Sequence, residues 1–230
     1  MTDDAPTSLG RVKIAPSILA ADFAELAAEV ERVGDADLLH VDCMDGHYVP
    51  NLTIGPPVVK SLRARTDLYL DCHLMVSNPG DLIEGFADAG ADGCTIHIEL
   101  GDPRPVFDRI RALGMRVGLT FEPETPYSAV EPYLGEIDVL LVMSVKTGFG
   151  GQPFISSVLD KAREAREAID SRGLPVEIEI DGGISLETAP LAAAAGVDIL
   201  VAGTAVFHRP DPAAAVRDLR AVASTAARSR

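Results

Sequence analysis

Eight apolar runs rich in Val, Ile and Leu recur along this chain, and each is short enough to form one buried strand. Amphipathic stretches of helical spacing lie between them, and several end at a glycine, as helices commonly do. The runs begin roughly 20–30 residues apart, the spacing of one strand–helix unit, with one longer gap after the sixth. They cover residues 12–19, 38–44, 68–76, 93–99, 115–121, 139–145, 176–183 and 198–206.

Eight such units in 230 residues predict an α/β fold, a (β/α)8 barrel in a single domain. A doubly wound sheet has the same alternation, but APSILAADF, and no GxGxxG, follows the first run. No linker or change in composition divides the chain, so the domain is expected to span 1–230, with 1–10 and 224–230 as loose ends. Helices are expected at 22–34, with Asp22 as N-cap, and at 78–90, 102–114 and 185–196, the last starting at Ser185.

The composition fits a barrel core. Hydrophobic residues make up 47% of the chain, and because Trp is absent, Ala, Val, Leu and Ile must fill the interior. No apolar stretch reaches the length of a membrane span. The first ten residues, MTDDAPTSLG, lack the basic start and apolar core of a signal peptide, so none is expected.

The cysteines indicate the compartment in which the protein works, and the net charge excludes some classes of binding partner. The three cysteines, Cys43, Cys72 and Cys94, are odd in number and lie in predicted strands, which predicts unpaired thiols and a cytoplasmic protein. The net charge of −15 argues against nucleic acid or an anionic membrane as a partner. An anionic substrate would have to be held by local donors.

Polar residues at the carboxyl ends of the predicted strands lie where such barrels build active sites. His40 and Asp42 are two residues apart and therefore share one face of their strand. His73 and Asp181 lie near the ends of two other strands. Two imidazoles and two carboxylates suit a divalent ion such as Zn²⁺, Fe²⁺, Mn²⁺ or Co²⁺, so these four residues predict a metal site. For any one histidine, a satisfied position in the core is the alternative.

Other residues are expected to have supporting or structural roles, or fit two roles equally well. His97 and Glu99 alternate on one strand and are expected to support the site or to fill a layer of the barrel. Loop, structural or solvated positions are expected for His47, His208, Glu177 and Glu179. Core filling and lining of the active site fit three methionines at strand ends equally well: Met44, Met75 and Met143.

Glycine clusters follow the last three predicted strands. Glycine lets backbone N–H groups approach a ligand closely. In many barrels the loops after the seventh and eighth strands bind phosphate, which suits an acidic protein without a basic patch. Ordinary tight turns are the alternative, but three clusters in neighbouring loops favour phosphate. The clusters are Gly148-Phe149-Gly150-Gly151, Gly182-Gly183 and Gly203-Thr204.

Six segments, spread from the first predicted strand to the last, together resemble the ribulose-phosphate 3-epimerase family. They are IAPSILAADF (14–23), HVDCMDGHYVPNLTIGPPVV (40–59), DCHLMV (71–76), MSVKTGFGGQPF (143–154), EIDGGI (179–184) and VAGTAVF (201–207). The combination is highly specific and covers nearly the whole chain. It implies a (β/α)8 TIM barrel of the ribulose-phosphate-binding type.

The resemblance implies roles for individual residues. One divalent metal is expected on His40, Asp42, His73 and Asp181, with the two aspartates as the acid–base pair. Substrate contacts are expected from Ser17, His73, Gly148, Phe149, Gly150, Gly151, Asp181, Gly182, Gly183, Gly203 and Thr204. The resemblance further implies a cytoplasmic isomerase of the pentose phosphate pathway that forms homodimers or hexamers.

The implied reaction is the reversible C3 epimerisation of D-ribulose 5-phosphate to D-xylulose 5-phosphate through an enediolate. It needs one proton-transfer group on each face of a planar intermediate. Asp42 and Asp181 come from strands on different sides of the expected barrel mouth, which permits this. A bound metal would stabilise the negative charge of the enediolate.

Two segments depart from the family pattern. Lys146-Thr147 precede GFGGQ, and Thr120-Phe121-Glu122 end the fifth predicted strand. Lys146 is expected either to reach the phosphate or to point into solvent. A 3-epimerase of another ketose phosphate, such as D-allulose 6-phosphate, is therefore the alternative. A barrel that binds phosphate without catalysis is disfavoured because both aspartates are present, and a metal-free enzyme of tryptophan or histidine biosynthesis would not use the metal set.

Overall fold

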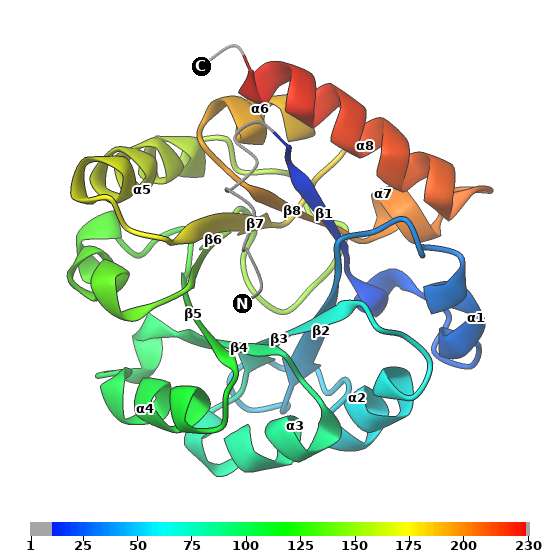
Figure 1. Cartoon of the computed structure of the whole chain (residues 1–230), viewed down its shortest axis with the longest axis horizontal. Coiled ribbons are helices and arrows are strands. Elements are labelled where there is room, and N and C mark those ends of the chain that lie inside the picture. The colour runs from blue at the N-terminus through cyan, green and yellow to red at the C-terminus, as the bar shows by residue number, and fades with distance from the viewer. Residues whose placement is uncertain (1–10, 229–230) are drawn as a thin grey trace, which may run out of the picture.

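Eight parallel strands form a nearly closed barrel in the computed structural model, which describes residues 11–228 (Figure 1). Neighbouring strands pair in the order β1-β8-β7-β6-β5-β4-β3-β2, and a parallel bridge between Ser17 and His40 joins the first strand to the second. The strands are β1 Lys13–Pro16, β2 Leu38–Met44, β3 Tyr69–Met75, β4 Gly93–His97, β5 Arg116–Phe121, β6 Val139–Met143, β7 Glu177–Asp181 and β8 Ile199–Ala202.

Helices surround the barrel (Figure 1). The α-helices are α1 Leu26–Glu31, α2 Pro56–Arg63, α3 Ile83–Ala89, α4 Arg104–Ala112, α5 Val158–Arg172, α6 Ala189–Ala194, α7 Thr204–Phe207 and α8 Pro212–Ala227. Short 3-10 helices are η1 Ile18–Ala20, η2 Pro79–Asp81, η3 Ile98–Leu100, η4 Tyr127–Ala129 and η5 Glu131–Glu136. Among the described residues, no helix combines the length and the apolar character needed to cross a membrane.

Alternation along β2 decides which side chains face the barrel interior. Leu39, Val41 and Cys43 are buried in the large apolar cluster that also contains helix residues such as Val59 and Phe86. Because successive side chains point to opposite faces of a strand, His40 and Asp42 must face inward. Packing of the outer face therefore directs these two polar side chains into the barrel.

All eight predicted strands are present, but most of the predicted runs extend beyond the strands, and the first and last runs do so by the most residues. The run at 12–19 is a strand only to Pro16; Ser17 then caps η1 by accepting a hydrogen bond from the Leu19 N–H. The strand predicted at 198–206 is wrong over its last residues, because β8 ends at Ala202 and α7 follows. The β-branched residues Thr204 and Val206 favour a strand, and the tertiary structure overrides that preference.

The four predicted helices all begin later in the structure than predicted, at Leu26, Ile83, Arg104 and Ala189. Helix α1 begins at Leu26, because the Asp22 carboxylate accepts a hydrogen bond from the Ala24 N–H in a local turn before it. Helix α6 begins at Ala189, after a turn in which the Ser185 hydroxyl accepts a hydrogen bond from the Thr188 N–H. The predicted glycine stop at Gly90 is confirmed, since this residue ends α3 in the left-handed conformation.

The predicted loose ends agree only in part with the structure. Helix α8 continues to Ala227, so residues 224–227 are not the loose end that was predicted. The predicted loose ends at 1–10 and 229–230 lie outside the described residues. Cys43, Cys72 and Cys94 are buried free thiols, as predicted.

Candidate active site

Four ionisable side chains converge at the carboxyl end of the barrel, as the sequence predicted. They are His40 and Asp42 of β2, His73 of β3 and Asp181 of β7, and one ligand atom from each lies within 4.8 Å of the others. Asp42 Oδ1 lies 3.3 Å from both His40 Nε2 and His73 Nδ1. Asp181 Oδ2 lies 4.0 Å from His40 Nε2. The two histidines are fully buried, whereas the Asp181 side chain is 20% exposed.

The donor set fits a divalent metal ion. Among the described residues, His40 Nε2 is buried with no hydrogen-bond partner, although it faces both aspartates. An imidazole nitrogen left in this way is costly unless something binds its lone pair. Two imidazoles and two carboxylates match the ligand preferences of Zn²⁺ and of the divalent ions of Mn, Fe and Co.

The two aspartates have opposite electrostatic surroundings. Burial tends to raise the pKa of Asp42, but the charges and hydrogen bonds of His40 and His73 hold that pKa well below its usual range. Burial and the neighbouring Asp42 raise the pKa of Asp181 to about 6. Despite its burial, His40 has a raised pKa because carboxylates surround it. Two nearby carboxyls whose pKa values are pushed apart are typical of acid–base sites.

Two further carboxylates approach His40 from its other side: Asp71, which the sequence analysis did not consider, and Glu179, which it expected to be structural or solvated. His40 Nδ1 lies 2.7 Å from Asp71 Oδ2 and 3.4 Å from Glu179 Oε1. Both residues are buried, so Glu179 is not solvated. The signal was present in the sequence: Asp71 and Glu179 each precede a predicted ligand by two residues, so they share its strand face.

Glu179 should make the stability of the metal-free protein depend on pH. Burial and the charge of Asp71 raise its pKa from 4.5 to about 8, so between these values the folded chain holds a proton that the unfolded chain releases. The free energy of unfolding therefore falls as pH rises through this range, and Asp181 adds a smaller fall of the same sign. Denaturant titrations should show that Glu179→Gln flattens this fall by at least about 1 kcal/mol.

A control for this prediction lies on the same strand. Glu177 forms ion pairs with Lys13 and Arg116, and its pKa is lowered despite its burial. A Glu177→Gln variant should not flatten the fall in stability toward high pH. If Glu179→Gln keeps the pH dependence of the parent protein, Glu179 does not hold the proton assigned to it.

The predicted supporting pair lies beside His73. His97 is buried, and its Nε2 lies 2.9 Å from His73 Nε2. Burial lowers the pKa of His97 to about 4, so the ring is neutral. Burial tends to raise the pKa of Glu99, but hydrogen bonds from His97, Thr125 and the backbone bring it to about 2, so Glu99 is a carboxylate.

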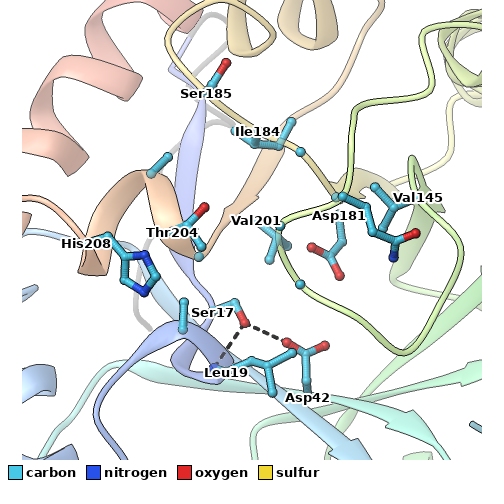
Figure 2. A pocket seen from close by; sticks show the side chains of 18 of the residues that line it. Ser17, Leu19, Asp42, Val145, Asp181, Ile184, Ser185, Val201, Thr204 and His208 are labelled. Carbon is cyan, nitrogen blue, oxygen red and sulfur yellow. Dashed lines mark hydrogen bonds between the residues drawn. The ribbon is translucent and has the colours of Figure 1, made fainter. Parts of the chain in front are cut away.

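A pocket of about 1010 Å³ opens above this histidine–aspartate cluster, and Asp42 and Asp181 lie at its floor (Figure 2). Ser17 also lines it, and its hydroxyl donates a 2.6 Å hydrogen bond to Asp42 Oδ2. The predicted glycine clusters meet along one wall: Gly148, Phe149, Gly150, Gly151, Gly182, Gly183, Gly203 and Thr204. His73 is too deeply buried to be part of the lining.

Glycine is required at two positions of this wall. Gly182 and Gly183 both have positive φ angles, of 119° and 63°. A Cβ on Gly182 would lie 2.5 Å from a Val145 methyl carbon, and one on Gly183 would lie 2.8 Å from the Phe154 backbone nitrogen. The loop after β7 therefore packs too tightly at these two positions to accept a side chain.

Two of the three methionines predicted at the site, Met75 and Met143, line the pocket. Met44 is not part of the lining and packs against Val49 and Met75 in a small apolar cluster. His47 lies exposed in the loop after β2, and His208 is exposed at the pocket rim. Lys146 points into solvent rather than into the pocket.

Of the two segments that depart from the family pattern, Lys146-Thr147 reaches the pocket. Thr147 is buried in its wall, and its backbone N–H donates a hydrogen bond to Glu122 Oε2 at 3.2 Å. Thr120 and Phe121 are buried on β5, outside the lining. The two unusual segments are therefore linked through Glu122 and Thr147.

Fold and site together define a TIM-barrel enzyme with a buried histidine–aspartate centre beneath a glycine-lined pocket. The model of the ribulose-phosphate 3 epimerase family matches residues 13–207. A ribulose-phosphate 3-epimerase of Mycobacterium tuberculosis is 54% identical over 223 residues, covering 95% of this chain and 96% of the relative. The Bacillus subtilis enzyme of that name is 45% identical, covering 91% of this chain and 98% of the relative. The chain belongs to the ribulose-phosphate 3-epimerase family and is an isomerase that epimerises a sugar phosphate.

Solved structures of other enzymes share the fold. KGPDC from Streptococcus mutans superposes with a TM-score of 0.70 at 17% identity, covering 94% of this chain and 98% of that one. A 3-keto-L-gulonate-6-phosphate decarboxylase from Vibrio cholerae has a TM-score of 0.71 at 17% identity, covering 94% and 98%. At these identities the likeness establishes the barrel fold alone.

Proposed function

We propose that this chain interconverts D-ribulose 5-phosphate and D-xylulose 5-phosphate. The observation that carries the proposal is the placement of Asp42 and Asp181, whose carboxyl groups face each other across the pocket floor (Figure 2). They belong to β2 and β7, which are separated by β1 and β8 in the barrel. A planar intermediate bound between them would present one face to each carboxyl group.

The reaction needs one proton to leave C3 and one to arrive on the opposite face. One aspartate removes the C3 proton as a carboxylate, and the other, as a carboxylic acid, returns a proton from the far side of the enediolate. The reverse reaction exchanges the two roles. Ser17 holds Asp42 for this task, since its hydrogen bond occupies Oδ2 while Oδ1 faces the two histidines.

His40, Asp42, His73 and Asp181 would hold the metal ion. A divalent ion bound there supplies positive charge that stabilises the enediolate oxygens. Zn²⁺, Fe²⁺, Mn²⁺ and Co²⁺ all suit these ligands. Met75 and Met143 line the pocket with Asp42 and Asp181, and their apolar surface would help to keep water from the centre.

The substrate phosphate is assigned to the glycine-lined wall of the pocket. The loops after β6, β7 and β8 meet there, and the loops after the seventh and eighth strands bind phosphate in many barrels. Backbone N–H groups would hold the anion, which explains how a chain of net charge −15 binds a phosphate ester. The proposal includes a cytoplasmic location and a place in the pentose phosphate pathway. It also includes the dimer or hexamer that the family resemblance implies.

An exchange experiment tests the function. The purified protein is incubated with D-ribulose 5-phosphate in D₂O, and NMR follows both the products and the deuterium at C3. We expect D-xylulose 5-phosphate that carries deuterium at C3. If metal-loaded protein neither exchanges nor converts this substrate, the proposed substrate is wrong, and D-allulose 6-phosphate is the next to try.

A further inference from the structure

Two buried histidines from neighbouring strands stack beneath the pocket. The rings of His73 and His97 lie 5.1 Å apart and within 22° of parallel, and both are fully buried. Their Nε2 atoms are separated by 2.9 Å, which is hydrogen-bonding distance. Since neither ring faces water, one Nε2 must carry a proton and the other must accept it.

The metal site decides the direction of this hydrogen bond. His73 presents Nδ1 to the cluster, 3.3 Å from Asp42 Oδ1. A ligand nitrogen needs its lone pair, so a neutral His73 that binds a metal through Nδ1 carries its proton on Nε2. His73 is then the donor to His97 Nε2.

Nδ1 of His97 extends this series of hydrogen bonds to Glu99. With Nε2 accepting, a neutral His97 carries its proton on Nδ1, which lies 3.3 Å from Glu99 Oε2. Glu99 is itself held in place, because its Oε1 accepts hydrogen bonds from the Glu122 N–H at 2.8 Å and the Thr125 hydroxyl at 2.6 Å. Every proton from the metal site to the Glu99 carboxylate then has a fixed place.

We infer that His97 and Glu99 are positioning residues that hold His73 in the tautomer whose Nδ1 is free to bind the metal. This inference rests on the proposed function, because that function supplies the metal. Hydrogen-bonding partners behind a ligand histidine fix its tautomer and ring orientation, and their loss typically weakens metal binding about 10–100-fold. His97 acts through His73 and lies outside the pocket lining.

Two substitutions at one position separate hydrogen bonding from packing. His97→Leu fills the buried space without an acceptor. His97→Gln supplies an amide oxygen that accepts from His73 and an NH₂ group that donates to Glu99. Zn²⁺ affinity is measured by competition with a chromogenic chelator, and ¹⁵N NMR of the metal-free protein identifies which nitrogen of His73 is protonated.

The expected results differ for the two variants. In the parent protein the proton of His73 should lie on Nε2, and His97→Leu should weaken Zn²⁺ binding about 10–100-fold and disturb that tautomer. His97→Gln should keep the tautomer and most of the affinity. Circular dichroism of the metal-free variants checks that both remain folded.

Three results would overturn the inference. These are a parent His73 protonated on Nδ1, a His97→Leu variant with the affinity of the parent, and equal losses in both variants. If the parent converts D-ribulose 5-phosphate and binds Zn²⁺ while His97→Leu is unaffected, this inference fails alone. If the parent binds no metal, the metal-assisted function fails as well.

Discussion

Replacing either Asp42 or Asp181 by asparagine should reduce turnover of D-ribulose 5-phosphate by about 10²–10⁴-fold. Asparagine keeps the size of the side chain and an oxygen that can face a metal, but it neither removes nor supplies the C3 proton. Both side chains lie at the pocket floor, so the loss should appear in kcat more than in KM. Steady-state rates in both reaction directions measure it.

Isotope exchange sharpens this prediction. Each variant keeps one proton-transfer group, so in D₂O one variant should exchange the C3 proton of D-ribulose 5-phosphate and the other that of D-xylulose 5-phosphate, with little conversion in either. The metal content of each variant is determined in parallel. A variant that retains near-parent turnover would remove its aspartate from the acid–base pair.

A carboxylate at the pocket rim provides the control. Glu187 lines the pocket but is exposed and belongs to the loop before α6. A Glu187→Gln variant removes the same charge from the same pocket without touching the floor. It should keep kcat within about twofold, since exposed charges have weak effects at a distance.

The site was predictable because strand geometry alone brings its main residues together. Alternation on β2 puts His40 and Asp42 on one face, and in a parallel barrel all strands end at the same mouth. Once eight strand–helix units were recognised, His73 and Asp181 had to lie near them. The glycine clusters converge for the same reason, since they follow three neighbouring strands.

The missed features depend on packing between elements. Glu177 and Glu179 share one face of β7 and look alike in sequence, and only the closed barrel shows that Glu179 meets His40 inside while Glu177 pairs with Lys13 and Arg116. From the sequence, Met44 fitted a core position and a position in the site lining equally well. In the structure the loop after β2 brings Val49 against Met44, so Met44 is a core residue. Alternation can place such a side chain on a strand face, but its partner depends on how distant elements pack together.

Removing the bound metal with a chelator should abolish epimerisation, and adding a divalent ion back should restore it. Without the ion, no positive charge offsets the negative charge that develops on the sugar oxygens, so we expect a loss of at least about 10³-fold. Restoring the protein with Zn²⁺, Fe²⁺, Mn²⁺ or Co²⁺ in turn, at equal occupancy, identifies the ion that supports the highest rate. Full turnover by protein shown to be metal-free would exclude the metal-assisted mechanism.

Substitution of the histidines tests whether the metal sits where the geometry places it. His40→Asn and His73→Asn should each lower the metal bound per chain and lower turnover with it, because each removes one of four converging ligands. His47→Asn and His208→Asn remove exposed imidazoles that lie outside the cluster, so both should bind metal as the parent does. Metal analysis after dialysis separates the two pairs. Unchanged stoichiometry in His73→Asn would remove His73 from the ligand set, and with it the reason for a fixed proton between His73 and His97.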